Sequence, residues 1–199
     1  MTLELFIEKY DLPGKIVLLL GKRNVLAEDK EKVIELGSKL TQTTKHILFR
    51  SGNAAGSDEL FVKGVSKIAS ERIQVITPYS GHRKKASSTL YSIPLDALDV
   101  VNEPELLYHS KQDKKNKNLI ERYEQGFKDA NAMKGAYLLR DTLMVVGAKG
   151  VELKRADFAI FYDDLSSPKK GGTGHTMKVC DSLEIPFINQ KTWTDWFIK

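Results

Sequence analysis

Cysteine is almost absent from this 199-residue sequence, and long hydrophobic runs are absent altogether. The single cysteine, Cys180, has no second thiol in the chain to pair with, so a reducing compartment is the expected setting. The apolar run at residues 16–20 has the length of a strand and is far too short to span a membrane. Glu4, Glu8 and Asp11 interrupt the N-terminal apolar residues, which is unlike a signal peptide. We therefore expect a cytoplasmic chain with no membrane partner.

A strong excess of one charge is also absent. The chain has 31 Lys and Arg against 26 Asp and Glu, and the formal net charge of +5 is too small to indicate nucleic acid by itself. Basic residues gather at residues 83–85 and 111–117 and at Lys169 and Lys170, and solvated surface lysines are the simplest interpretation. The sequence has no internal repeat, low-complexity linker or zinc-ligand spacing, so residues 1–199 are predicted to form one domain without a metal site.

The sequence does contain an alternation of short apolar runs and amphipathic segments. Strands are expected at residues 15–20, 46–49 and 73–76, with helices at residues 29–43 and from about residue 57 onward. Strands joined by helices in this way normally pair in parallel through right-handed crossovers. The order therefore predicts an α/β fold of three layers, with a mostly parallel sheet and helices on both faces.

The second half of the chain is expected to complete this sheet. Residues 79–118 lose the alternation and are interpreted as an excursion of short helices and loops. Residues 119–146 have a helical pattern with a break near Gly135, although residues 142–146 could instead form a short strand. The remaining predicted elements are strands at 158–162 and 186–188, a helix at 176–183, and a short helix at 193–198 that covers the sheet edge.

Two glycine-rich turns that follow predicted strands are the most informative feature of the chain. The first glycine turn is residues 50–58 (RSGNAAGSD), and the second glycine turn is residues 171–176 (GGTGHT). A turn between a strand and a helix start directs backbone N–H groups and the positive end of a helix dipole at one point, which suits phosphate. Because parallel strands share their carboxyl edge, the two turns predict a nucleotide-sized crevice.

The order of several short motifs resembles a known superfamily. The motifs are G-K-R at residues 21–23, the first glycine turn, R-D-T-L-M-V at 140–145, R-A-D at 155–157 and the second glycine turn. The series is similar to the Rossmann-like group that contains the DNA-processing protein DprA, the Lonely Guy phosphoribohydrolases once described as lysine decarboxylases, and the SLOG sensor domains. The resemblance implies a Rossmann-like fold with a nucleotide or nucleotide-derived ligand at the turns. The pattern is closest to the small SLOG sensor-type proteins.

The second glycine turn departs from the phosphoribohydrolase motif P-G-G-x-G-T-x-x-E, in which the glutamate is catalytic and pairs with an upstream arginine. Lys170 stands at the proline position, His175 at the threonine position and Lys178 at the glutamate position. Arg140 matches the upstream arginine, but an arginine stays protonated and cannot act alone as an acid or base. The sequence therefore favours ligand binding over this particular reaction.

Three functions are consistent with these residues. The leading hypothesis is the binding of a nucleotide or nucleotide-derived ligand between the two turns, as in a sensor or nucleotide-signalling component. The first alternative is a nucleoside-monophosphate phosphoribohydrolase or related N-glycosidase, in which a carboxylate replaces the missing glutamate. The second alternative is DprA-like single-stranded DNA binding, which needs a basic groove with stacking aromatics. The catalytic candidates for the enzyme are Asp58, Arg140, Asp163 and Glu152.

The predicted ligand contacts come from one strand end and the two turns. Lys22 and Arg23 could clamp a phosphate, and Asp58 either accepts from a ribose hydroxyl or caps the helix beside it. His175 and Thr176, at the predicted start of a helix, could contact phosphate as well. The predicted set is Gly21, Lys22, Arg23, Ser51, Gly52, Asn53, Gly56, Ser57, Asp58, Arg140, Gly171, Gly172, Thr173, Gly174, His175 and Thr176.

Asp157, Asp163 and Asp164 flank the strand before the second glycine turn. They could hold Mg²⁺ beside phosphates or serve acid–base chemistry, while turn formation at a strand end is the simpler interpretation. No other cofactor is predicted. Because members of the similar group often self-associate, the resemblance leaves a homo-oligomer open, with residues 79–118 as a candidate interface.

Overall fold

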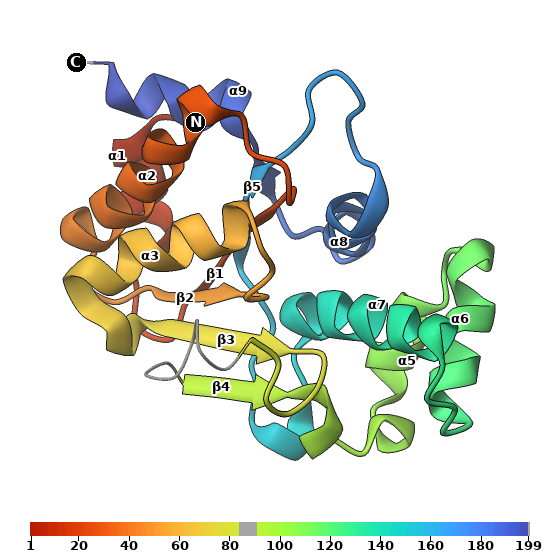
Figure 1. Ribbon diagram of the computed structural model, residues 1–199. Coiled ribbons are helices and arrows are strands. Elements are labelled where there is room, and N and C mark those ends of the chain that lie inside the picture. The colour runs from red at the N-terminus through yellow and green to blue at the C-terminus, as the bar shows by residue number, and fades with distance from the viewer. Residues whose placement is uncertain (84–90, 199) are drawn as a thin grey trace.

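The computed structural model describes residues 1–83 and 91–198 of the chain (Figure 1). Within these residues, six strands form one parallel sheet in the order β4-β3-β2-β1-β5-β6. Because every pairing is parallel, the carboxyl ends of the strands lie at the same edge. The strands are β1 (Ile16–Gly21), β2 (Leu48–Ser51), β3 (Ile73–Thr77), β4 (Tyr91–Pro94), β5 (Phe158–Tyr162) and β6 (Phe187–Ile188).

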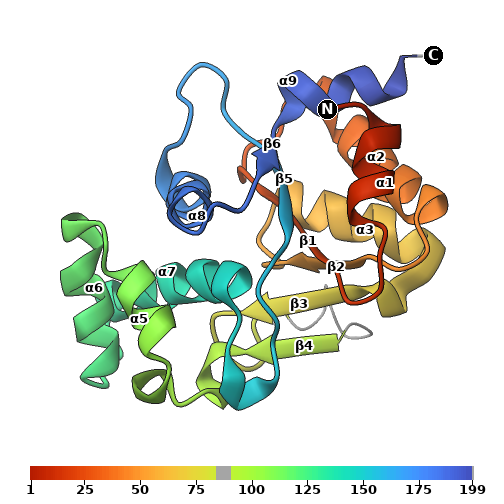
Figure 2. The same cartoon turned by 180° about the vertical axis from the view of Figure 1, so that it is seen from behind.

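Helices cover both faces of the sheet and make a three-layer structure (Figures 1 and 2). One face carries α1 (Leu3–Tyr10), α2 (Lys30–Thr43), α3 (Ser57–Ala69) and α9 (Gln190–Trp193). The opposite face carries α5 (Pro104–Ser110), α7 (Ala130–Val146) and α8 (Gly171–Ser182), and α6 (Lys114–Glu124) packs against α7. The predicted fold class, a three-layer Rossmann-like α/β fold, is confirmed.

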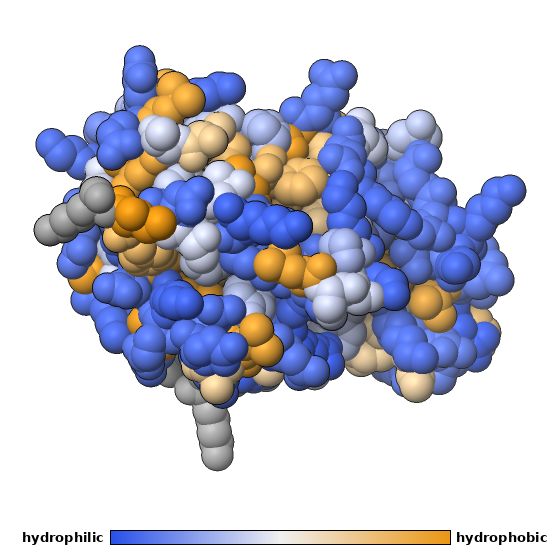
Figure 3. Space-filling view, turned by 90° about the horizontal axis from the view of Figure 1, so that it is seen from above, coloured by the Kyte–Doolittle hydropathy of each residue, from blue (hydrophilic) through white to orange (hydrophobic). Residues whose placement is uncertain are grey.

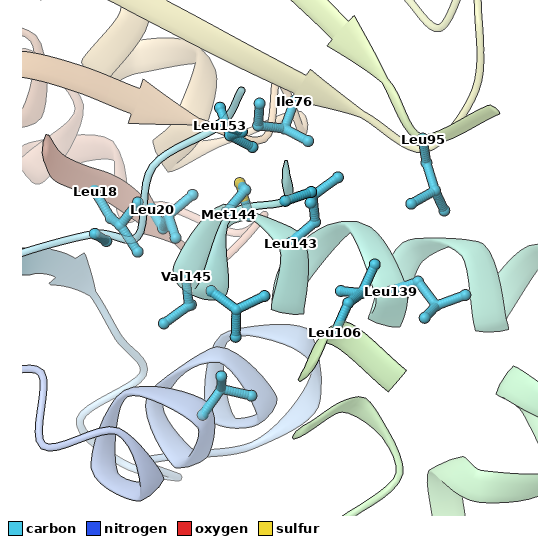
Figure 4. Close-up of a cluster of buried hydrophobic side chains, with 14 of the residues drawn as sticks. Leu18, Leu20, Ile76, Leu95, Leu106, Leu139, Leu143, Met144, Val145 and Leu153 are labelled. Carbon is cyan, nitrogen blue, oxygen red and sulfur yellow. The ribbon is translucent and has the colours of Figure 1, made fainter. Parts of the chain in front are cut away.

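Strand β1 is buried on both of its faces. Leu18 and Leu20 belong to the hydrophobic cluster that includes residues of α7 and α8 (Figure 4). Val17 and Leu19 belong to the cluster on the other face, with residues of α1, α2 and α3. Because successive side chains of a strand point to opposite faces, a central strand covered on both sides needs an apolar residue at each position. This requirement explains the continuous apolar run that begins at Ile16.

The sheet reverses its direction of growth at β1 and β5. From β1 the chain adds β2, β3 and β4 on one side, and it later returns to add β5 and β6 on the other side. At such a reversal the connections that leave neighbouring strands run to opposite faces of the sheet, which leaves a crevice at the carboxyl edge. The connections that follow β1 and β5 both begin there, and the first begins with Lys22 and Arg23, directly after Gly21 at the end of β1.

The excursion expected at residues 79–118 contains more regular structure than the sequence indicated. It includes the strand β4, which extends the sheet beyond β3, as well as helix α5 and the start of α6. The part of this prediction that concerns residues 84–90, including Lys84 and Lys85 of the basic run, lies outside the described residues.

The helical region before β5 is interrupted at a different place from the one predicted. The break expected near Gly135 is wrong, because α7 runs through this glycine and the interruption lies at residues 125–129. A Cβ on Gly135 would lie 2.2 Å from the carbonyl oxygen of Leu119, so the glycine permits the close approach of α6. The alternative of a strand at residues 142–146 is also wrong, since these residues form the end of α7.

Smaller differences concern the ends of other elements. Strand β2 begins and ends two residues later than expected, and it includes Arg50, which is fully buried. The Arg50 guanidinium donates to the carbonyl oxygen of Met144 and to Oε1 of Gln74. At the C-terminal end, a 3-10 helix (Thr194–Phe197) follows α9. Among the described residues, no helix combines the length and the apolar character needed to cross a membrane.

Candidate functional site at the carboxyl edge of the sheet

A cavity of about 1160 Å³ opens at the carboxyl ends of β1 and β5. Its wall includes the end of β1 and the segment after it, the β5–α8 connection, the first turns of α8, residues of α6 and α7, and Asp58 of α3. Ligand pockets commonly have volumes of about 300–1,000 Å³, so this space is large enough for a small organic ligand. The face of the molecule seen from above is mostly hydrophilic, with hydrophobic residues in scattered groups (Figure 3).

The second glycine turn forms the first turn of α8 and does not precede the helix. The predicted helix start at residue 176 is therefore wrong, because α8 begins at Gly171. The N–H of Gly174 donates to the Lys170 carbonyl, whereas the N–H groups of Gly171, Gly172 and Thr173 have no acceptor within the described residues. The first amides of a helix carry the positive end of its dipole, so this turn presents hydrogen-bond donors that suit an anion.

Side chains of the protein itself fill the first glycine turn. Arg140, from α7, lies against Gly52 and donates from Nη1 to the Gly52 carbonyl oxygen. A Cβ on Gly52 would lie 1.8 Å from the same Nη1, so a side chain at this position would displace the arginine. Among residues 50–58, only Ala54 and Asp58 line the cavity. The first turn therefore packs around Arg140 and leaves little of its own backbone at the cavity.

Asp58 is a buried carboxylate, 4% exposed, in the first turn of α3. Its Oδ1 accepts a hydrogen bond of 3.0 Å from the N–H of Gly21. The alternative prediction that Asp58 caps the helix is wrong, because Gly56 is the N-cap residue and no side chain caps this end. Burial raises the pKa of Asp58 to about 6, although the nearby positive charge of Arg140 opposes the rise. This carboxyl group can therefore gain or lose a proton near neutral pH.

One face of α7 lines the cavity between Lys134 and Met144. Tyr137 and Asp141 lie on this face at helical intervals of three and four residues. The Nε of Arg140 lies 3.0 Å from Oδ1 of Asp141, and the two side chains are only 5% and 11% exposed. Nε makes no hydrogen bond within the described residues, so the contact is ionic. Arg140 thus compensates the buried charge of Asp141 as well as that of Asp58.

Asp157 and Asp164 have structural roles. Asp157 precedes β5, at the edge of the sheet opposite the cavity, where it pairs with Lys15 at 2.7 Å and accepts from the N–H of Ile16. The alternative interpretation, in which Asp157 pairs with the other two carboxylates, is therefore wrong. Asp164 accepts from the hydroxyl and the N–H of Ser166, and these hydrogen bonds lower the pKa of Asp164. This geometry fits the simpler interpretation of a turn-forming aspartate.

Asp163 lines the cavity and is 2% exposed. Gln190 holds its backbone on both sides, because Oε1 accepts from the Asp163 N–H at 2.9 Å and Nε2 donates to the Asp163 carbonyl oxygen. The carboxylate Oδ2 accepts from the N–H of Lys169 at 3.0 Å. The other oxygen, Oδ1, is buried without a partner in the described part of the chain. Asp163 is thus a rigidly held, buried carboxylate with one oxygen that has no donor in the described structure.

His175 and Thr176 follow the glycines in α8. His175 is 6% exposed, with Nε2 at 2.8 Å from the Thr142 hydroxyl and Nδ1 at 3.3 Å from Nδ2 of Asn116. Burial lowers the pKa of His175, so the imidazole is neutral at pH 7. Thr176 donates to the carbonyl oxygen of Gly172. Both ring nitrogens of His175 already have neighbours, and contact with a phosphate would require the loss of one of them.

The cavity wall includes many of the residues in the predicted set. Those that line it are Gly21, Lys22, Arg23, Asp58, Arg140, Gly171, Gly172, Thr173, Gly174, His175 and Thr176. Those that do not are Ser51, Gly52, Asn53, Gly56 and Ser57. The hydroxyls of Ser51 and Ser57 donate instead to the carbonyl oxygens of Leu19 and Lys22. Glu152 is exposed and lies outside the wall, so it cannot replace the missing glutamate.

Some cavity residues were missed by the analysis of the sequence. Tyr137 precedes Arg140 by three positions in the helix, so the helical pattern around this arginine could have indicated it. Asp141 directly follows Arg140 in the R-D-T-L-M-V motif. Lys115 and Asn116, from α6, also line the wall. No local signal indicates these two residues, because their position depends on how α6 packs against α7.

The described residues contain no group of three or more His, Cys, Asp or Glu side chains that could hold a metal ion.

No family model matches the sequence. No curated protein matches it either. Among solved structures, the chain is similar to DNA processing protein A from Helicobacter pylori, which was studied for its single-stranded DNA binding mode. The TM-score is 0.49 at 15% sequence identity, and the alignment covers 90% of this chain but 66% of that protein, slightly less than two thirds.

Proposed function

We propose that this chain binds a nucleotide or nucleotide-derived ligand in the cavity at the carboxyl edge of the sheet. The observation that carries the proposal is the first turn of α8, where the amides of Gly171, Gly172 and Thr173 lie at the cavity wall without an acceptor in the described structure. Helix starts at the reversal point of a parallel sheet are well suited to phosphate groups. The phosphate would therefore occupy the α8 end of the cavity.

The charges around the cavity support a ligand with both an anionic group and hydroxyl groups. Lys22 and Lys170 line the wall and raise the local positive potential. Asp163 and Asp141 also line it, and their carboxylate oxygens are acceptors for hydroxyl donors. A sugar phosphate carries the anion and the hydroxyls in one molecule, and a nucleotide adds a base. Inorganic phosphate would leave most of the cavity unused.

Calorimetric titration with a panel of nucleoside mono-, di- and triphosphates and cyclic nucleotides tests the proposal. We expect saturable binding of at least one compound, and binding should weaken in Lys22→Glu and in Lys170→Glu. Lys67→Glu is the matched control, because it makes the same charge change in the last turn of α3, outside the cavity wall. The absence of binding for the entire panel would contradict the proposal.

A second candidate function, N-glycosidic bond hydrolysis, is favoured by the carboxylates at the cavity. Water would attack the anomeric carbon of a nucleotide, the bond to the base would break, and the base would leave with a proton. The buried Oδ1 of Asp163 has no donor in the described structure and could accept the proton of a water that reaches it. Asp58, whose pKa is raised to about 6 by burial, could supply the proton to the base. Arg140 would have an electrostatic role, since it remains protonated.

Chromatographic measurement of free base released from AMP tests this second candidate. Hydrolysis should be lost in Asp163→Asn and in Asp58→Asn while AMP binding is retained. Binding without any release of base would exclude hydrolysis of AMP and leave the binding proposal intact. A parallel titration with oligodeoxythymidylate at several salt concentrations distinguishes single-stranded DNA binding, which would show a steep salt dependence.

A further inference from the structure

An aromatic side chain, Tyr137, forms part of the cavity wall on α7, one helical turn before Arg140. Its side chain is half-buried. The guanidinium carbon of Arg140 lies 5.7 Å from the centre of the Tyr137 ring, and that of Arg23 lies 6.0 Å from it. Both arginines also line the cavity. Both guanidinium groups thus lie over the ring in cation–π contacts, and both belong to residues of the cavity wall.

Two further rings support Tyr137 from the segment that follows β3. His82 meets the Tyr137 ring edge-on, with a centroid distance of 5.8 Å and an interplanar angle of 78°. Tyr79 packs in the same edge-on way against His82, at 5.0 Å and 81°. Edge-to-face contacts of this kind restrict ring orientation. Tyr137 is thus held by neighbours that do not line the cavity themselves.

The cavity wall also contains apolar side chains from α6 and α7. Leu138 and Met144 of α7 line the cavity, and Leu119 of α6, which packs against α7, lines it as well. These apolar groups offer no hydrogen bonds to phosphate or sugar hydroxyls. A flat ligand group with a π-face can stack on an aromatic ring, interact with nearby guanidinium groups and pack against apolar side chains at the same time.

We propose that Tyr137 is the platform on which the base of the ligand stacks, with Arg23 as the cation beside it. The site would then select nucleobase-bearing ligands over sugar phosphates and inorganic phosphate. This inference rests on the proposed function, since it assigns one end of the same cavity to the base and leaves the α8 end to the phosphate. Tyr137 acts as a specificity-determining residue and takes no part in any bond-breaking step.

The test compares calorimetric titrations of AMP, ribose 5-phosphate and inorganic phosphate. The unaltered protein should bind AMP at least about tenfold more tightly than ribose 5-phosphate, because base–aromatic stacking contributes an affinity factor of this order. Tyr137→Leu should weaken AMP binding about tenfold and leave ribose 5-phosphate binding unchanged. Tyr137→Phe keeps the ring and should retain the AMP affinity. Tyr108→Leu, at an exposed tyrosine of α5 outside the cavity wall, is the control.

Equal affinities of the unaltered protein for AMP and ribose 5-phosphate would overturn the inference while leaving an anion-binding site in place. This comparison needs no variant, so it decides the question even if Tyr137→Leu folds poorly. An equal loss of AMP and ribose 5-phosphate binding in Tyr137→Leu would also overturn it, since Tyr137 would then only support Arg140. If none of the three compounds and no other nucleotide of the panel binds, both the inference and the proposed function fail.

Discussion

The two glycine turns look alike in sequence but differ in what occupies them. In the first turn, Arg140 lies against Gly52 and donates to its carbonyl oxygen, so the protein fills the space that glycine provides. In the second turn, the glycines belong to the start of α8. A Cβ on Gly171 would meet nothing within 4 Å, whereas a Cβ on Gly172 would lie 2.8 Å from Oδ2 of Asp141 and one on Gly174 would lie 2.0 Å from the Lys169 carbonyl oxygen. A glycine-rich turn after a strand therefore indicates close approach, but it does not tell whether a ligand or the protein approaches.

The largest expected effect comes from removing the side chain that fills the first turn. Arg140→Ala leaves Asp58 and Asp141 buried without their compensating charge, so we expect the free energy of unfolding to fall by about 3–5 kcal/mol. Urea unfolding followed by circular dichroism measures this. Lys117→Ala, which removes an exposed ion pair with Glu121, should change stability little. Similar values for the two variants would contradict the description of the first turn.

The next effect concerns the backbone of the first turn. Gly56 has a φ of +94°, and a Cβ there would lie 2.1 Å from the carbonyl oxygen of Arg23. Gly56→Ala combines backbone strain with a steric clash and should cost roughly 2–4 kcal/mol of unfolding free energy. Gly126→Ala is the matched control, because Gly126 has a φ of +80° and open space around it. If both variants lose the same unfolding free energy, the steric clash with the Arg23 carbonyl does not contribute to the loss.

The buried carboxylate of the first turn should make stability depend on pH. The pKa of Asp58 is about 6 in the folded protein against 3.8 for the ordinary group, so the folded state holds this proton more tightly. Its contribution to stability is fully present below about pH 4 and is lost as the pH rises to about 6, by up to about 3 kcal/mol. The unfolding free energy of Asp58→Asn, relative to the unaltered protein, should therefore rise over this interval. A constant difference would refute the raised pKa.

The smallest effect on stability, with a clear effect on binding, is expected in the second turn. Thr173→Pro removes one unfilled amide of α8 and breaks no helical hydrogen bond, since proline is tolerated in the first turn of a helix. We expect a loss of less than about 1 kcal/mol in stability. Nucleotide binding should weaken about tenfold, as a hydrogen bond to a charged group is lost. Thr173→Ala keeps the N–H and should bind normally; equal binding by both variants would argue against amide recognition.

The sheet and its carboxyl edge could be predicted because a buried strand is visible in the sequence as a run of consecutive apolar residues. Burial on both faces makes β1 a continuous apolar run, and the same holds for β5. Arg50 is an exception to this apolar pattern. It is fully buried in β2, because Gln74 and the Met144 carbonyl satisfy its guanidinium, and neither partner is near it in sequence. The predicted strand accordingly ended one residue before it.

The cavity residues that come from helices α6 and α7 were less predictable than those at the strand ends and at the start of α8. Gly21 is the last residue of β1, and the second glycine turn begins the helix that follows β5, so the order of the strands brings them to the same edge. The contribution of α6 depends on Gly135 and the packing it allows against Leu119, which no local pattern indicates. The filling of the first turn depends likewise on Arg140, 88 residues away from Gly52. Long-range packing of this kind decides which glycines of the two similar turns contact the protein itself.

The most direct test of the difference between the turns is an NMR titration of the ¹⁵N-labelled protein with AMP. Amides of Gly171, Gly172 and Thr173 should shift progressively and to saturation, since they are the donors that the cavity leaves unfilled. The amides of Gly52 and Asn53, which are packed around Arg140, should shift little in comparison. Large shifts confined to the first turn, with the start of α8 unchanged, would contradict the account.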